Sequence, residues 1–240
     1  METPITSLLE GLVDTRSEQK ERAFLSLLTL GDQALPCLIG ALSMKKYAPA
    51  WPLLIQIIQI IGTHASIDDA IPPLLRFLKD SNKPIYEVAY KSLLTMGDVV
   101  LYNARDILAY CWSDDVWIQE VCVLLTNMNT VHLDMLVPEI LHLFEIGTDE
   151  NCLDEHVIDL LCKIGSPKAN AVVPLLQEKI LSRNRESIRH ASIEALQYFD
   201  PSIIRPLIPL LRECLSDPSE AIRSSAKKVL DALDEMTGET

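Results

Sequence analysis

The sequence predicts an all-α protein, a right-handed solenoid of about seven stacked helical hairpins. Three observations predict it: helical runs end at regular intervals, an aspartate recurs between paired helices, and a proline recurs in the first helix of each pair. All three series repeat about every 34 residues. Together they account for the whole chain, so we expect one repeat domain over residues 1–240.

Glycine marks most of the predicted helix ends. It follows an apolar helical run four times, and Met128-Asn129 and Asp200-Pro201 stand at the equivalent places where glycine is absent. Glycine tolerates the positive φ with which a chain often leaves a helix. The four glycines are Gly31, Gly62, Gly97 and Gly165.

Aspartate marks the turn inside several hairpins. An apolar or small residue tends to follow at positions +5, +9 and +13, which is the spacing of one helix face. We expect the aspartate to cap the helix that follows by accepting backbone N–H bonds. The series is Asp14, Asp80, Asp114 and Asp217.

Proline recurs at one point of the first helix of each hairpin. Inside a helix it removes one backbone hydrogen bond, so we expect a similar bend in each first helix. The series is Pro36, Pro72, Pro138, Pro174 and Pro209.

These features resemble the HEAT repeat family, within the armadillo-like and PBS-lyase-type group. The last repeat, RPLIPLLRECLSDPSEAIRSSAKKVLDAL, matches best, with Pro209, Asp217, Arg223, Ala226 and Leu230 in the family layout. The resemblance implies a helical solenoid whose second helices line the concave face. It implies a fold and not a reaction.

Several classes of chemistry do not fit the sequence. There is no phosphate-binding loop and no nucleophile elbow. No histidine is followed by glutamate, as in the iron ligands that the HEAT-like deoxyhypusine hydroxylases carry, and a net charge of −13 opposes binding to nucleic acid. We therefore expect no enzyme activity and no cofactor. A HEAT-like lyase acting on a partner-bound ligand stays an alternative.

One set of side chains has the spacing of a metal site. Glu155, His156 and Asp159 share about one helical turn. The same spacing is common on solvated polar helix faces, and we expect no metal there.

The chain has the composition of a cytoplasmic protein. Its first residues, METPITSLLEGL, hold two glutamates and no long apolar core, and Gln56 and Gln59 interrupt the longest uncharged stretch. We therefore expect no membrane association. The six cysteines lack metal-ligand spacing, which indicates reduced thiols in the core.

An acidic block lies in the middle of the chain. Between Arg105 and Lys163 there is no basic residue. We interpret the block either as a solvated surface or as a docking surface for a basic protein. Its carboxylates are Asp106, Asp114, Asp115, Glu120, Asp134, Glu139, Glu145, Asp149, Glu150, Asp154, Glu155 and Asp159.

Aromatic residues gather beside the start of this block. They either pack between repeats or serve as interface contacts, and Tyr90 and Trp117 are the contacts that we expect. The full group is Tyr86, Tyr90, Tyr102, Tyr110, Trp112 and Trp117.

The predicted binding surface is an acidic ladder. About seven residues after each junction, three successive second helices carry Glu87, Glu120 and Glu155, with Asp159 and Glu194 nearby. The ladder favours a protein scaffold or adaptor that binds a basic helix or tail along the concave face. A dedicated inhibitor, such as an immunity-type protein masking a basic toxin or enzyme, is the alternative.

The second repeat carries no charge on its second helix. Trp51, Ile55 and Ile58 either form an exposed apolar strip for self-association or are buried between neighbouring repeats.

Overall fold

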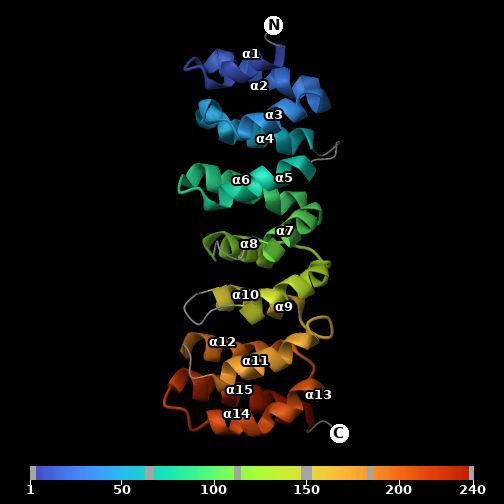
Figure 1. Ribbon diagram of the computed structural model, residues 1–240, viewed down its shortest axis with the longest axis vertical. Helices are drawn as coiled ribbons and strands as arrows, with labels where there is room; N and C mark the ends of the chain where they lie inside the picture. The colour runs from blue at the N-terminus through green and yellow to red at the C-terminus, as the bar shows by residue number, and fades with distance from the viewer. Residues whose placement is uncertain (1–3, 63–67, 111–114, 147–152, 183–185, 238–240) are drawn as a thin grey trace. The chain divides into compact units, whose positions relative to one another are not determined.

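The computed structural model describes residues 4–62, 68–110, 115–146, 153–182 and 186–237, and all regular secondary structure in these ranges is helical (Figure 1). This confirms the all-α class. The chain divides into two compact units. Unit 1 is Met1–Ala104 with Asn127–Asn129, and unit 2 is Arg105–Thr126 with Thr130–Thr240. That both belong to one domain over residues 1–240 stays a prediction.

Unit 1 is built from three helical hairpins. The second helix of each hairpin packs on the next, so that α4 lies against both α2 and α6 (blue to green in Figure 1). The elements are α1 (Pro4–Val13), α2 (Ser17–Leu30), η1 (Gly31–Gln33), α3 (Leu35–Leu42), η2 (Lys45–Ala50), α4 (Trp51–Ile61), η3 (Asp68–Ala70), α5 (Ile71–Arg76), η4 (Phe77–Lys79) and α6 (Lys83–Met96), followed by α7 (Val99–Tyr110), whose second half belongs to unit 2.

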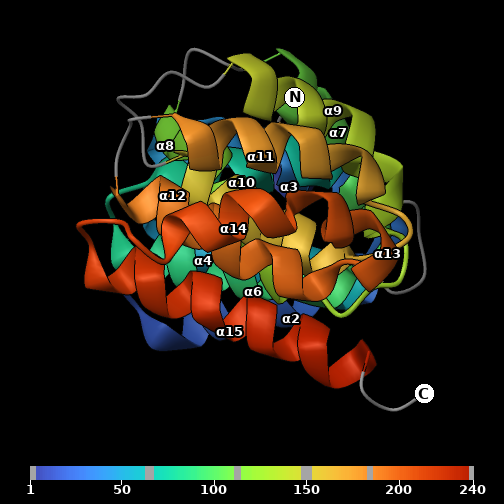
Figure 2. The same cartoon turned by 90° about the horizontal axis from the view of Figure 1, so that it is seen from below.

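Unit 2 continues the pattern. Its helix α12 packs against its own hairpin partner α11 and between α10 and α15 (Figure 2). We call α10, α12 and α15 the second-helix layer. The elements are α8 (Asp115–Asn127), η5 (Leu133–Leu136), α9 (Val137–Ile146), α10 (Leu153–Ile164), η6 (Asn170–Val172), α11 (Val173–Leu181), α12 (Glu186–Ala195), η7 (Leu196–Tyr198), α13 (Pro201–Ile204), η8 (Arg205–Leu207), α14 (Ile208–Cys214) and α15 (Glu220–Thr237).

The core follows the predicted helix face. Ile85, Ala89 and Leu93, at +5, +9 and +13 from Asp80, are all buried. The equivalent Ile222 and Ala226 are buried as well. Apolar residues spaced by four lie on one side of a helix, and each hairpin buries that side against its neighbours.

Contacts between repeats join residues about one repeat apart. Gln59 donates to Thr95 Oγ1 at 2.9 Å, 36 residues on, and Lys163 Nζ donates to the carbonyl of Thr126 at 2.5 Å, 37 residues back. Equivalent positions therefore meet across the stack, as the repeat of about 34 residues predicts.

The recurring prolines have a different role from the one predicted. Pro36, Pro72, Pro174 and Pro209 occupy the first or second position of an α-helix that follows a 3-10 turn. The first helical positions have no intrahelical acceptor for their N–H groups, so proline starts the α-helix there without losing a hydrogen bond. The predicted mid-helix bend is wrong: the first helix of the repeat is a 3-10 turn followed by an α-helix.

The junction aspartates also act differently from the prediction. Oδ1 of Asp14, Asp80 and Asp217 accepts the N–H of the residue two positions later, at 2.8, 2.8 and 2.9 Å. These acceptors order the turn before the helix, and the N-cap position is held by the next-but-one residue. Asp200, which precedes α13, is itself an N-cap, and Asp114 lies outside the described residues.

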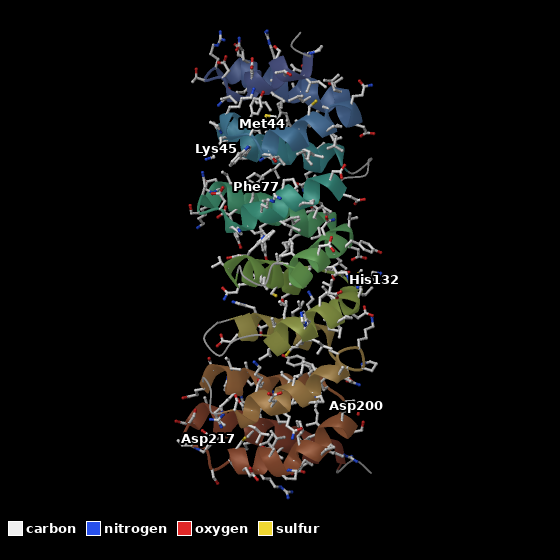
Figure 3. All side chains as sticks on the ribbon, in the orientation of Figure 1. Met44, Lys45, Phe77, His132, Asp200 and Asp217 are labelled. Atoms are coloured by element: carbon white, nitrogen blue, oxygen red, sulfur yellow. The ribbon has the colours of Figure 1, made fainter. Side chains whose placement is uncertain are left out.

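The apolar strip on α4 is not exposed. Ile55 and Ile58 are 0% exposed. Trp51 donates its indole N–H to the carbonyl of Ala41 at 3.3 Å and packs on Phe77, with ring centroids 4.9 Å apart (Phe77 is labelled in Figure 3). The exposed-strip interpretation is therefore wrong, because α4 is enclosed by α2, α3 and α6.

No single described helix is long and apolar enough to cross a membrane. Among the described residues, one pair of consecutive helical segments, Ser17–Gln33 and Leu35–Leu42, reaches that length and apolar content when taken together, and the pair is bent by 114°. The cysteines are not uniformly buried as predicted. Cys122 and Cys214 are buried, whereas Cys37 is exposed.

Candidate functional site

The acidic ladder is divided between the two units. Glu87 is exposed on α6 of unit 1, 3.8 Å from Lys83 Nζ. Glu120 on α8 and Glu155 on α10 are half-buried and belong to unit 2. The seventh residue after Asp114 is Val121, which is buried, so Glu120 stands one place out of the predicted register. Of the three ladder residues, Glu120 and Glu155 belong to unit 2 and Glu87 to unit 1, and the ladder as a binding surface stays a prediction.

The two predicted aromatic contacts are partly enclosed. Tyr90 is half-buried and stacks on Tyr86, with ring centroids 5.7 Å apart. Trp117 is half-buried on α8. Trp112 lies outside the described residues. The Tyr86–Tyr90 stack has the geometry of ordinary helix-surface packing at i, i+4 spacing.

The described carboxylates of the acidic block lie on different elements and have different partners, and Asp149 and Glu150 lie outside the described residues. Glu139, on the first helix α9, accepts a hydrogen bond from Arg105 Nε at 2.6 Å. Asp134 lies 3.0 Å from Lys168 Nζ, which lowers the pKa of its carboxyl group. These carboxylates stabilise contacts between repeats. Asp159 and Glu155, by contrast, lie on the second helix α10.

The second-helix layer of unit 2 contains a hollow of about 320 Å³. Three helices form it: α10 supplies Asp159 and Cys162, α12 supplies His190 and Glu194, and α15 supplies Lys228. Two of the seven predicted binding residues, Asp159 and Glu194, thus lie together in one concave site.

Glu194 is partly engaged by its own chain. Its Oε1 accepts from Ser225 Oγ at 3.3 Å and lies 3.6 Å from His190 Nε2 and 3.7 Å from Lys228 Nζ. All three contacts involve the same carboxylate oxygen. The side chains are 34 to 61% exposed, so water screens these pairs and each contributes little to stability.

Asp159 lies in the same hollow, and its negative charge is less compensated by nearby positive charge than that of Glu194. Desolvation raises the pKa of its carboxyl group, which Glu155 raises further and His156 opposes. Among the described residues no cation forms an ion pair with it. Cys162 beside it is a neutral thiol, because burial raises its pKa to about 12. A cation entering the hollow would relieve the cost of holding Asp159 charged.

Sequence reasoning missed Lys228 and Tyr198 as parts of this site. Asp159, Glu194 and Lys228 are separated by 35 and 34 residues, so they are equivalent positions of three successive repeats. Counting one more repeat from Glu194 would have found Lys228. Tyr198 could not be found in this way, because η7 carries it beyond the end of α12.

No group of three or more potential metal ligands forms in the described parts of the chain, and Glu155, His156 and Asp159 do not make one. Unit 1 has a hollow of another kind, about 520 Å³ between α1 and α2, lined by Pro4, Ser7, Leu8, Ser26, Thr29 and Leu30.

No family model matches the chain, and no curated protein matches it. Solved structures that resemble it include a designed armadillo repeat protein, at 16% identity and TM-score 0.45, covering 95% of this chain and 98% of that one. Human deoxyhypusine hydroxylase in complex with glycerol is similar at 17% identity and TM-score 0.40, covering 96% of each chain.

Proposed function

We propose that this protein is a non-catalytic interaction module that binds a basic segment of a protein partner at the second-helix layer of unit 2. Helical repeat proteins present extended surfaces of this kind to partners. The observation that carries the proposal is the hollow that Asp159 and Glu194 line together, where the described contacts of the Glu194 carboxylate all involve Oε1.

The charge of unit 2 supports this proposal. Unit 2 has 23 acidic and 12 basic residues, a net charge of −11. A field of that sign attracts basic segments and raises their rate of association, with an effect that salt screens. The hollow then fixes where the segment binds, because concave, partly desolvated sites strengthen charge interactions.

The experiment compares two double variants with the same change in charge. Glu155→Lys with Asp159→Lys alters the second-helix layer. Glu178→Lys with Glu213→Lys alters exposed residues of the first helices α11 and α14. A partner captured from native host lysate is purified, and its Kd for each variant is measured at about 50, 150 and 300 mM salt.

We expect the first double variant to weaken binding at least about 30-fold, and the control by no more than about threefold. The wild-type affinity should fall with salt, and the first variant should lose most of that dependence. Equal weakening by both variants would mean that net charge alone matters, and an unchanged affinity in the first would remove the site.

An inhibitor of a basic enzyme or toxin uses the same chemistry and is favoured by the same net charge of unit 2. The two roles separate when the captured partner's own activity is assayed with and without this protein. An inhibitor abolishes that activity at stoichiometric ratio, whereas a scaffold leaves it intact.

A further inference from the structure

The hollow of unit 2 has a more specific lining than its charge alone suggests. Its two carboxylates come from adjacent helices of the second-helix layer, so they approach a bound group from two sides. Cys162 and Ile158 supply apolar surface at the same place. Tyr198 also lines the hollow, and this residue is 58% exposed.

We infer that this hollow receives one arginine side chain of the partner, and that Lys228 competes with it for Glu194. This inference rests on the proposed function and specifies its partner: a segment with an exposed arginine. The geometry that carries it is the juxtaposition of Asp159, Glu194 and Tyr198 around one hollow.

Arginine fits this lining better than lysine does. A guanidinium group is planar and has five N–H donors on several edges, so one group can donate to two carboxylates that lie on different sides. Its face stacks on an aromatic ring, here that of Tyr198. The ammonium of lysine is a strongly hydrated point charge and meets fewer of these groups at once. The methylenes of either side chain can lie on the apolar surface of Ile158 and Cys162.

The size of the hollow agrees with a single side chain. Its volume of about 320 Å³ is at the lower end for small-molecule sites and far too small for a helix. The rest of the partner segment therefore lies across the exposed surface of α10 and α12, where Glu155 is half-buried.

Lys228 stands where the arginine would bind. Its Nζ lies 3.7 Å from Glu194 Oε1, and its side chain is 61% exposed. A pair this long and this exposed is weak, so an arriving guanidinium can displace it. While Lys228 stays near, its positive charge also repels the incoming cation. Removal of the Lys228 charge should therefore strengthen binding of the arginine. This is the opposite of what is usual, because the loss of a charged residue at a binding site mostly weakens binding.

The test uses single amino-acid derivatives as probes: N-acetyl-arginine amide, its lysine counterpart and the uncharged isostere N-acetyl-citrulline amide. Binding to the full chain is followed by two-dimensional amide NMR, with shifts mapped onto α10, α12 and α15. We expect millimolar binding of the arginine probe, about fivefold weaker binding of the lysine probe, and no saturable binding of the citrulline probe.

Three variants sharpen the test. Lys228→Met keeps the apolar stem and removes the charge, and should strengthen arginine binding about three- to tenfold. Lys227→Met is the matched control, an exposed neighbour on the same helix that does not line the hollow, and should change binding less than twofold. Asp159→Asn should weaken binding at least about fivefold. Circular dichroism verifies that each variant keeps its helicity.

Equal binding of the arginine and citrulline probes, or shifts mapped away from the hollow, overturns the inference. Weaker arginine binding by Lys228→Met overturns the role given to Lys228. If the arginine probe fails to bind while Glu155→Lys with Asp159→Lys still abolishes partner binding, the arginine inference fails and the proposed function stands. If the probe binds and that double variant leaves partner binding unchanged, the proposed function fails.

Discussion

The two units share one architecture but present different surfaces. Unit 1 has 11 acidic and 9 basic residues, a net charge of −2, against −11 in unit 2. In unit 1 the middle second helix α4 carries no charge, and its Gln59 joins Ser92 and Thr95 of α6 by hydrogen bonds. In unit 2 the equivalent layer holds Asp159, Glu194 and Lys228 around a polar hollow.

This difference shows that fold and binding chemistry are encoded at different positions of the repeat. In both units residues at +9 from the junction aspartate face the core and are small, for example Ala89 and Ala226. The solvent-facing positions are unconstrained by packing, so they can be polar and neutral in one unit and charged in the other. A repeat protein can thus alter its binding surface without altering its core.

The largest expected effect lies in the core of unit 1. Ile58→Ala should lower the free energy of unfolding by about 2 to 5 kcal/mol, because Ile58 is 0% exposed and its loss leaves a cavity. Ile60→Ala is the matched control on the same helix, since Ile60 is 51% exposed, and should cost less than about 1 kcal/mol. Urea unfolding measures both. Similar losses in the two variants would contradict the burial of Ile58.

The thiols of the two units should differ in reactivity. Cys37 of unit 1 is exposed, whereas Cys122 of unit 2 is buried and burial raises its pKa to about 12. Only the thiolate reacts, so alkylation of Cys122 by iodoacetamide at pH 8 should be at least about 100-fold slower. Peptide mapping by mass spectrometry over time gives both rates. Comparable rates in the native protein, with urea-unfolded protein as the control, would contradict the prediction.

The glycines at two helix ends, Gly97 and Gly165, allow the cost of backbone strain to be compared with the cost of steric crowding. Gly97 of unit 1 has φ 64° with open space at its Cβ position, so Gly97→Ala should cost about 1 to 2 kcal/mol through strain alone. Gly165 of unit 2 has φ 63°, and a Cβ there would lie 3.4 Å from the carbonyl oxygen of Tyr198. Gly165→Ala should therefore lower the free energy of unfolding by more than Gly97→Ala does. Thermal unfolding compares them, and a smaller loss at Gly165 would show that crowding plays no part.

The smallest expected effect concerns the ion pair of Arg189 and Asp217 in unit 2. Arg189 stands at the repeat position that Tyr86 holds in unit 1. Arg189 donates to Asp217 of the next repeat and, through Nε, to the carbonyl of Ile180 at 3.2 Å (Asp217 is labelled in Figure 3). Arg189→Met should lower the free energy of unfolding at pH 7 by about 1 to 2 kcal/mol. Arg212→Met, on an exposed residue of α14, is the control.

The free energy of unfolding that Arg189→Met removes should depend on pH. The hydrogen bond from Arg189 lowers the pKa of Asp217 below its ordinary value of 3.8. The folded state therefore gains stability above that value, and the gain is lost as the pH falls through the lower folded pKa. The difference between wild type and Arg189→Met should shrink from pH 5 toward pH 2. A constant difference over that range would contradict the linkage.

The sequence determined the features that depend on local order along the chain. The repeat of about 34 residues, the helical class and the core face at Ile85, Ala89 and Leu93 were all predictable. They follow from helix periodicity and the need to bury one face of each hairpin, and both are properties of consecutive residues. The positive φ at Gly31, Gly97 and Gly165 was predictable for the same reason, but Gly62, of which the same was predicted, has φ −64°.

Local order also explains two errors in the prediction. The recurrence of the prolines and the junction aspartates was visible in the sequence, but their roles were not. Whether Pro174 bends a helix or begins one depends on where the 3-10 turn before it ends. Whether Asp217 caps a helix or a turn depends on a shift of two residues, and patterns locate helix ends less accurately than that.

Only the tertiary structure decided which side chains meet. Two members of the predicted ladder, Glu87 and Glu155, belong to different units, while Glu194 has Lys228 of the next repeat as a neighbour. Trp51, Ile55 and Ile58 are enclosed because α2 and α6 pack on α4. Solvent exposure and charge compensation are set by residues one repeat away, whose side chains approach only after the hairpins stack. The periodicity of a single helix contains no information about those neighbours.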